Sequence, residues 1–112
     1  MNEDETREIA EREAMFREVN ERLEALNESF AVVTSRFEVV CECGDKDCTA
    51  QLSMKGDDYE KLRSSPDLFV VAPGHSLEQV EEVVARGDGY DIVRKNPGLP
   101  TTLARETDPR GG

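Results

Sequence analysis

Residues 41–48 read Cys-Glu-Cys-Gly-Asp-Lys-Asp-Cys and place three thiols within eight residues. Zinc prefers a tetrahedral set of soft ligands, and three cysteines with one histidine form one of its usual structural sets. The chain contains a single histidine, which follows a Pro-Gly pair in a predicted loop and not on an apolar helix face. The pattern therefore predicts one zinc ion (Zn²⁺) per chain, held by Cys41, Cys43, Cys48 and His75.

The residues between these cysteines are predicted to shape the loop. Gly44 directly follows the second cysteine, where glycine permits the unusual backbone angles that point amide N–H groups at thiolate sulfur. Asp45 and Asp47 are interpreted as turn residues and not as ligands. Ser76 and Gln79 form a capping box that predicts a helix beginning directly after the histidine, with its positive end directed toward the thiolates.

Three other interpretations of the cysteines stay open. They can be ordinary buried thiols, since cysteine is often a small core residue, with the histidine on the surface. A [2Fe-2S] cluster with three cysteines and one histidine is another, although the separation of Cys43 and His75 does not match the short CDGSH-type spacing. A catalytic zinc site would need an open position and a nearby carboxylate, and His75 lacks the H-x-E pattern of deaminases.

The N-terminal third of the chain predicts one long helix over residues 3–28. Its apolar side chains recur by threes, fours and sevens at Ile9, Phe16, Val19, Leu23, Leu26 and Phe30. Arginines recur every five residues, each with a glutamate four positions earlier, at Arg7, Arg12, Arg17 and Arg22. The predicted apolar seam consists of Phe16, Val19, Leu23 and Leu26. Packing of this seam on the protein's own sheet is slightly favoured, and docking to a partner protein or self-association is the alternative.

The rest of the chain alternates between strand and helix patterns. Strands are predicted at 37–43, 49–54, 68–72 and 90–95, and short helices at 57–65 and 76–86, the second ended by Gly87. The predicted fold class is α+β, with a long N-terminal helix, a small mostly antiparallel sheet, two short helices and a zinc knuckle at the tip of a hairpin. The alternative is a local zinc module from which the N-terminal helix projects freely.

Three regions are predicted: an amphipathic helix at 1–30, a zinc-knuckle domain at 31–95, and a disordered tail at 96–112 that is rich in Pro, Thr, Gly and charge. The exposed-looking carboxylates, Glu81 and Glu82 among them, are interpreted as a solvated surface.

Charge and composition limit the partners and the location. Fourteen basic against 25 acidic residues give a net charge of -11, which argues against nucleic acid and anionic membranes as partners. No apolar run has the length of a membrane span, and the N-terminus is acidic where a signal peptide is basic. A tight cluster of thiols is typical of a metal site in a reducing compartment, so we expect a cytoplasmic protein.

The motifs C-E-C-G-D-x-D-C and A-P-G-H, with the Glu/Arg-rich N-terminal helix, resemble a group of small uncharacterised bacterial proteins over nearly the whole chain. The resemblance implies a zinc-knuckle domain of unknown role. The sequence contains no Ser-His-Asp order, no glycine-rich phosphate loop and no H-E-x-x-H motif. We therefore expect a non-enzymatic interaction or regulatory protein. The alternative is a thiol/zinc redox sensor or metal-dependent enzyme that uses the three cysteines.

Overall fold

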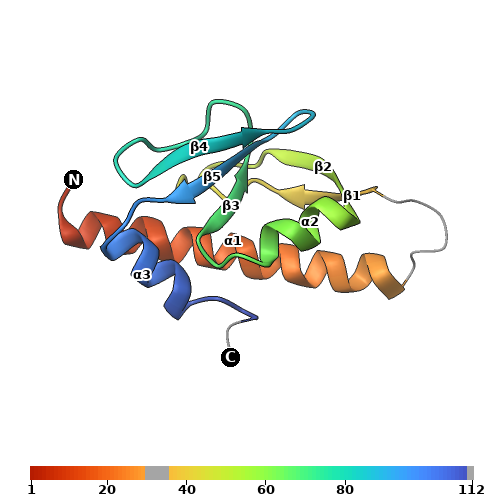
Figure 1. Ribbon diagram of the computed structural model, residues 1–112, viewed down its shortest axis with the longest axis horizontal. Coiled ribbons are helices and arrows are strands. Elements are labelled where there is room, and N and C mark those ends of the chain that lie inside the picture. The colour runs from red at the N-terminus through yellow and green to blue at the C-terminus, as the bar shows by residue number, and fades with distance from the viewer. Residues whose placement is uncertain (30–35, 111–112) are drawn as a thin grey trace.

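The computed structural model describes residues 1–29 and 36–110, and within them the chain forms three helices and five strands (Figure 1). In chain order these are α1 (Glu3–Ser29), β1 (Arg36–Val40), β2 (Gln51–Lys55), α2 (Gly56–Arg63), β3 (Leu68–Val71), β4 (Glu81–Arg86), β5 (Asp91–Lys95) and α3 (Leu99–Glu106). The α+β fold class is confirmed. Phe30 and residues 31–35 of the predicted zinc-knuckle domain lie outside the described residues.

The strands form two small antiparallel sheets. β1 pairs with β2 from Arg36 opposite Lys55 to Val40 opposite Gln51, which confirms the predicted hairpin. The second sheet has the order β3-β5-β4. The amide of Glu42 donates to the carbonyl of Val70 at 2.8 Å, so the chain that leaves β1 runs beside β3 and joins the two sheets.

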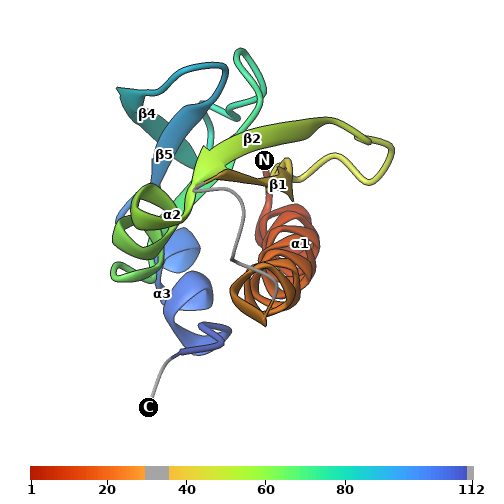
Figure 2. The same ribbon diagram turned by 90° about the vertical axis from the view of Figure 1, so that its right-hand side faces the viewer.

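The core lies between the strands and the helices. Figure 1 shows α1 running the length of the molecule below the strands, and Figure 2 shows α3 beside it. The largest fully buried apolar side chains come from the strands, from α2 and from the turn before β4, namely Val39, Met54, Tyr59, Phe69, Val70, Val71, Val80 and Val93. Tyr59 and Leu62 are buried on the inner face of α2. No helix in the described part of the chain combines the length and the apolar character that a membrane crossing requires.

The inner face of α1 is polar, which the apolar periodicity did not predict. Its buried residues are Glu13, Arg17, Asn20 and Glu24, whereas Val19 and Leu26 are exposed. Glu13 accepts hydrogen bonds from Lys95 at 2.7 and 2.9 Å. Arg17 donates to the carbonyls of Pro66 and Ala104 and lies over the ring of Phe69. Buried charge is tolerated on this face because strands, loops and α3 supply partners for it.

The predicted ladder of ion pairs along α1 forms only near its N-terminus. Arg7 pairs with Glu3 at 3.2 Å and Arg12 with Glu8 at 3.7 Å. Arg17 does not pair with the glutamate four residues before it, because burial turns its guanidinium to backbone carbonyls instead. Beyond Arg12, the stability of α1 therefore depends on packing against the rest of the protein.

The helix predicted at 76–86 is wrong. Residues 77–80 form a turn, and β4 follows and pairs with β5 through a bulge between Val83 and Ala85. Pairing with β5 overrides the local capping pattern, since β4 gains backbone hydrogen bonds along one edge of the sheet, before and after the bulge. Gly87 lies in the turn between the two strands, where an added Cβ would lie 2.2 Å from the Tyr90 ring. This glycine is required by a close contact and not by a helix end.

The disordered tail predicted at 96–112 is also wrong over its described part. The structure has α3 at Leu99–Glu106, with Leu103 and Ala104 buried. Proline in the first turn of α3 is compatible with a helix, since the amide it lacks has no partner there. Arg110 then forms ion pairs with Glu21, Glu24 and Glu60, which fix the chain against α1 and α2.

Candidate metal centre

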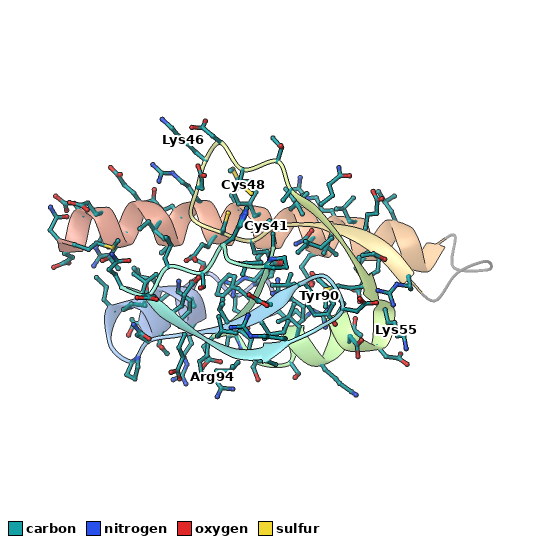
Figure 3. All side chains as sticks on the ribbon, turned by 90° about the horizontal axis from the view of Figure 1, so that it is seen from above. Cys41, Lys46, Cys48, Lys55, Tyr90 and Arg94 are labelled. Atoms are coloured by element: carbon teal, nitrogen blue, oxygen red, sulfur yellow. The ribbon has the colours of Figure 1, made fainter. Side chains whose placement is uncertain are left out.

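The predicted ligands come together from two parts of the fold. Cys41 and Cys43 follow β1, Cys48 lies in the turn before β2, and His75 lies in the loop after β3. Their ligand atoms lie within 4.8 Å of one another, close enough to hold a metal ion. Figure 3 shows Cys41 and Cys48 in the loop that crosses above α1, with Lys46 at its tip.

The nearest contacts join histidine and thiols. Nδ1 of His75 lies 3.5 Å from Sγ of Cys48 and 3.7 Å from Sγ of Cys41. Cys41 and Cys43 are buried, Cys48 is partly buried and His75 is exposed. The cluster is therefore closed on the side of the protein core and reaches the surface through the imidazole ring.

The β1–β2 hairpin places the three cysteines. The amide of Cys41 donates to the carbonyl of Ala50, so the ladder extends one residue past β1 before the loop opens. Within the loop, the carboxylate of Asp45 accepts the amide of Asp47 at 2.9 Å, and its carbonyl accepts the amide of Cys48 at 3.1 Å. Asp45 is a turn residue as predicted.

Gly44 serves a different purpose from the predicted one. Gly44 does not have a positive φ, unlike Gly74, Gly89 and Gly98. An added Cβ would lie 2.6 Å from Cγ2 of Ile9 on α1 and 3.3 Å from the side chain of Leu77. The position requires glycine because α1 and the 77–80 turn approach the knuckle from both sides.

His75 is placed beside the cysteines by a tight turn, and it does not precede a helix N-terminus as the sequence predicted. The amide of His75 donates to the carbonyl of Ala72 at 3.0 Å. Because no helix starts at Ser76, the predicted helix dipole does not act on the thiols. The amide of Ala72 instead donates to Sγ of Cys41 at 3.1 Å, so a backbone dipole from the end of β3 favours negative charge on that sulfur.

Burial disfavours negative charge on the sulfur atoms of Cys41 and Cys43. Desolvation raises the pKa of Cys41 above its usual range, and the hydrogen bond from Ala72 offsets part of the effect. Burial also raises the pKa of Cys43, against a hydrogen bond from the backbone of Asp45. Without a cation these two sulfurs favour the protonated thiol, so metal binding at this site releases protons.

Glu42 lies between two predicted ligands and is fully buried. Arg63 donates to its two carboxylate oxygens at 2.7 and 2.8 Å, and Asn20 donates to one of them at 2.7 Å. The amide of Val70 donates at 3.1 Å. The Asn20 side chain also forms two hydrogen bonds with the backbone of Val40, accepting from its amide at 2.7 Å and donating to its carbonyl at 2.9 Å.

These contacts connect the start of the knuckle to α1, α2 and β3. Sequence reasoning missed Glu42, Asn20 and Arg63, and it interpreted Glu81 as solvated although Glu81 is buried beside Lys95. The available signal was the strand alternation, which places Glu42 on the face opposite its two cysteine neighbours.

The four residues predicted for partner binding do not share one environment. Phe16 and Leu23 are partly buried, and Leu23 packs against the core. Val19 and Leu26 are 37% and 57% exposed. The exposed apolar surface of α1 instead includes Met15, which is 54% exposed and which the sequence pattern did not single out.

Comparisons with protein-family models, with curated proteins and with solved structures found no significant match. The resemblance to small bacterial proteins with the same knuckle therefore stays a prediction.

Proposed function

We propose that the chain binds one zinc ion through Cys41, Cys43, Cys48 and Nδ1 of His75, as a structural centre of a non-enzymatic interaction module. The observation that carries the proposal is the convergence of four zinc-type ligand atoms from two separate loops within 4.8 Å. Three thiolates and one imidazole complete a tetrahedral shell and leave no open position for a substrate.

The distances support zinc. Ligand bonds of about 2.3 Å to sulfur and 2.0–2.1 Å to nitrogen place tetrahedral S and N atoms about 3.6 Å apart. The two Sγ–Nδ1 separations of 3.5 and 3.7 Å bracket that value. All other separations are at most 4.8 Å, so side-chain shifts of about 1 Å close the shell.

The position of the site supports a structural role. The centre joins the β1–β2 hairpin to the loop after β3, two segments that also meet through the amide of Glu42 and the carbonyl of Val70. A metal at this junction fixes the hairpin to the second sheet, and its binding free energy adds to the folding free energy. We place the module in the cytoplasm, where thiols stay reduced.

Elemental analysis tests the proposal on protein purified without added chelator. We expect about one zinc per chain in the wild type and in Asp47→Asn, an exposed loop control whose carboxylate is outside the cluster. We expect loss of that zinc in Cys43→Ser. Metal-free wild-type protein, or the visible absorption of an iron-sulfur cluster, would reject the proposal.

A thiol/zinc redox sensor is the second candidate, favoured by the partial exposure of Cys48 next to two buried thiols. Hydrogen peroxide would oxidise the Cys48 sulfur to a sulfenic acid and release one water. A neighbouring thiol would then displace hydroxide, form a disulfide, release a second water and expel the metal. Zinc release at micromolar peroxide with an intramolecular disulfide favours the sensor, and retention of zinc under these conditions favours the structural module.

A further inference from the structure

A groove runs between α1 and the end of α3, away from the metal centre. Its volume is about 510 Å³. Met15 and Pro109 contribute apolar surface, and the carboxylates come from Glu11, Glu18, Glu106 and Asp108. None of the described residues that line this groove is basic. We call it the acidic groove.

The acidic groove continues onto an exposed apolar stripe on α1. Met15, Val19 and Leu26, which we call the outer stripe, are 54%, 37% and 57% exposed and share one helix face, on which the exposed Arg22 lies between Val19 and Leu26. The stripe from Met15 to Leu26 extends along about 16 Å of the helix at 1.5 Å per residue. Exposed apolar side chains that gather on one helix face mark interaction sites more often than isolated ones do.

Three carboxylates of the acidic groove have no ion-pair partner in the described ranges 1–29 and 36–110, whereas the fourth, Asp108, accepts a hydrogen bond from the amide of Arg110. Glu11, Glu18 and Glu106 form no ion pair within these ranges, although Arg110 near the end of α3 pairs with three other glutamates. These carboxylates therefore keep their charge available to a bound cationic group. The net charge of the whole chain, -11, attracts basic partners from a distance.

We propose that the acidic groove and the outer stripe bind a basic amphipathic helix of a partner protein, a proposal that names the partner class of the interaction module and so rests on the proposed function. One face of such a helix places apolar side chains on Met15, Val19 and Leu26. Its lysines or arginines meet the carboxylates on both walls of the groove. This is the helix-in-groove mode, in which apolar anchors at i, i+3, i+4 and i+7 supply affinity.

The surface chemistry selects this occupant over two others. A second copy of the chain would bring its own Glu11 and Glu18 against Glu106 and Asp108, and like charges at an interface are repulsive. A small polyamine would neutralise the carboxylates but leave the outer stripe uncovered. A basic amphipathic helix satisfies both features at once.

Fluorescence anisotropy tests the proposal on zinc-loaded full-length protein. The probe is a fluorescein-labelled peptide of about 18 residues, made of leucine and lysine with the leucines on one helix face. A peptide of the same composition with its leucines spread around the helix is the control ligand. We expect saturable binding of the first peptide and binding at least about tenfold weaker for the second.

Paired protein variants then locate the binding surface. Met15→Ser with Val19→Ser should raise the Kd about tenfold, and Glu11→Gln with Glu18→Gln should raise it severalfold and weaken its salt dependence. Glu78→Gln with Glu82→Gln, which removes two exposed charges elsewhere, and Val84→Ser, which removes an exposed apolar side chain of β4, should leave the Kd within about twofold.

Several outcomes would overturn the proposal. They are no binding of the amphipathic peptide, equal binding of both peptides, or equal weakening by the Glu78 and Glu82 control. A wild-type dimer in sedimentation that Met15→Ser with Val19→Ser converts to monomer would assign the surface to a second copy instead. The Glu11 and Glu18 variant changes only exposed side chains, so it keeps the test valid if the apolar variant unfolds.

Zinc content measured on every sample separates this proposal from the metal site. Metal-free wild-type protein that still binds the peptide through the groove would reject the zinc centre alone. Zinc-loaded protein that does not bind the peptide would reject the groove alone.

Discussion

The buried ion pairs beside α1 and the Cys–His cluster obtain their positive charge from different sources. Beside the middle of α1, Arg63 balances Glu42, and Lys95 lies between Glu13 and Glu81 at 2.7 and 2.8 Å. Both cations there are side chains of the chain itself. The Cys–His cluster supplies only electron-pair donors, and under the proposed zinc site its cation comes from solution. The internal ion pairs therefore form whenever the chain folds, whereas the proposed zinc centre would depend on metal supply.

The largest expected effect is the removal of the metal. Cys43→Ser, or an excess of chelator on the wild type, should lower the free energy of unfolding by about 5 kcal/mol or more, because metal binding in small zinc domains adds directly to folding. Thermal unfolding with and without chelator measures it. Asp47→Asn is the matched control and should respond as the wild type does. An unchanged melting temperature in Cys43→Ser would contradict a structural centre.

Removal of an internal cation should come next. Arg63→Met leaves the carboxylate of Glu42 buried without its bidentate partner and should cost about 3–5 kcal/mol. The double variant Glu42→Gln with Arg63→Met removes the unpaired charge and should recover part of that loss. Urea unfolding of the single and double variants at saturating zinc measures both. A double variant less stable than Arg63→Met would show that charge burial is not the dominant cost.

The Lys95 cluster should give a smaller, pH-dependent effect. Desolvation raises the pKa of Glu13 to about 8, with Glu81 adding to the rise and Lys95 opposing it. The folded state then binds more protons than the unfolded state between pH 4.5 and about 8. The contribution of Glu13 to stability is therefore present at low pH and is lost as pH rises through that window.

The control for this effect is Glu13→Gln, which cannot ionise. Relative to that variant, the free energy of unfolding of the wild type should fall by roughly 2 kcal/mol from pH 5 to pH 8. The fall is smaller than the pKa shift of Glu13 alone would give, because the change in proton binding is shared with Lys95 and Glu81. Chemical unfolding of both proteins at saturating zinc measures the difference, since the metal site then contributes equally to both. A wild type that gains stability relative to Glu13→Gln over this range would contradict the raised pKa.

The smallest effect belongs to the partly exposed ion pairs of Arg110. Its hydrogen bonds lower the pKa of Glu60 to about 2. Stability from this pair is present above the ordinary pKa of a glutamate and is lost as pH falls toward 2. Arg110→Ala should cost at most about 1 kcal/mol, less in high salt, and should return the pKa of Glu60 toward its usual value. Carboxyl NMR titration of Glu60 checks this, and an unshifted titration would exclude Arg110 as the cause.

The parts of the fold that the sequence predicts are those determined by local pattern. The hairpin at 36–55, α2 and β3 follow from alternation and turn signals within a few residues. β4 and α3 could not be predicted, because their conformation depends on distant partners. β4 is held by its ladder with β5, and α3 by contact with α1.

The candidate site also has one part that local sequence predicts and another that it does not. Three of the proposed ligands lie within eight residues, and the fourth is the only histidine in the sequence, so spacing and chemistry predict them. The supporting residues Asn20, Glu42 and Arg63 lie 21 or 22 positions apart in the sequence and carry charges or amides typical of a solvated surface. Only their burial in the fold distinguishes them from the other polar residues of an acidic chain.

Zinc K-edge X-ray absorption on the purified full-length protein tests the central claim most directly. A closed centre of Cys41, Cys43, Cys48 and His75 predicts three sulfur neighbours at about 2.3 Å and one nitrogen neighbour at about 2.0–2.1 Å. In His75→Ala the sulfur shell should remain, while the imidazole scattering should disappear. A zinc shell with fewer than three sulfurs, imidazole scattering that persists in His75→Ala, or no bound zinc would contradict the proposed centre.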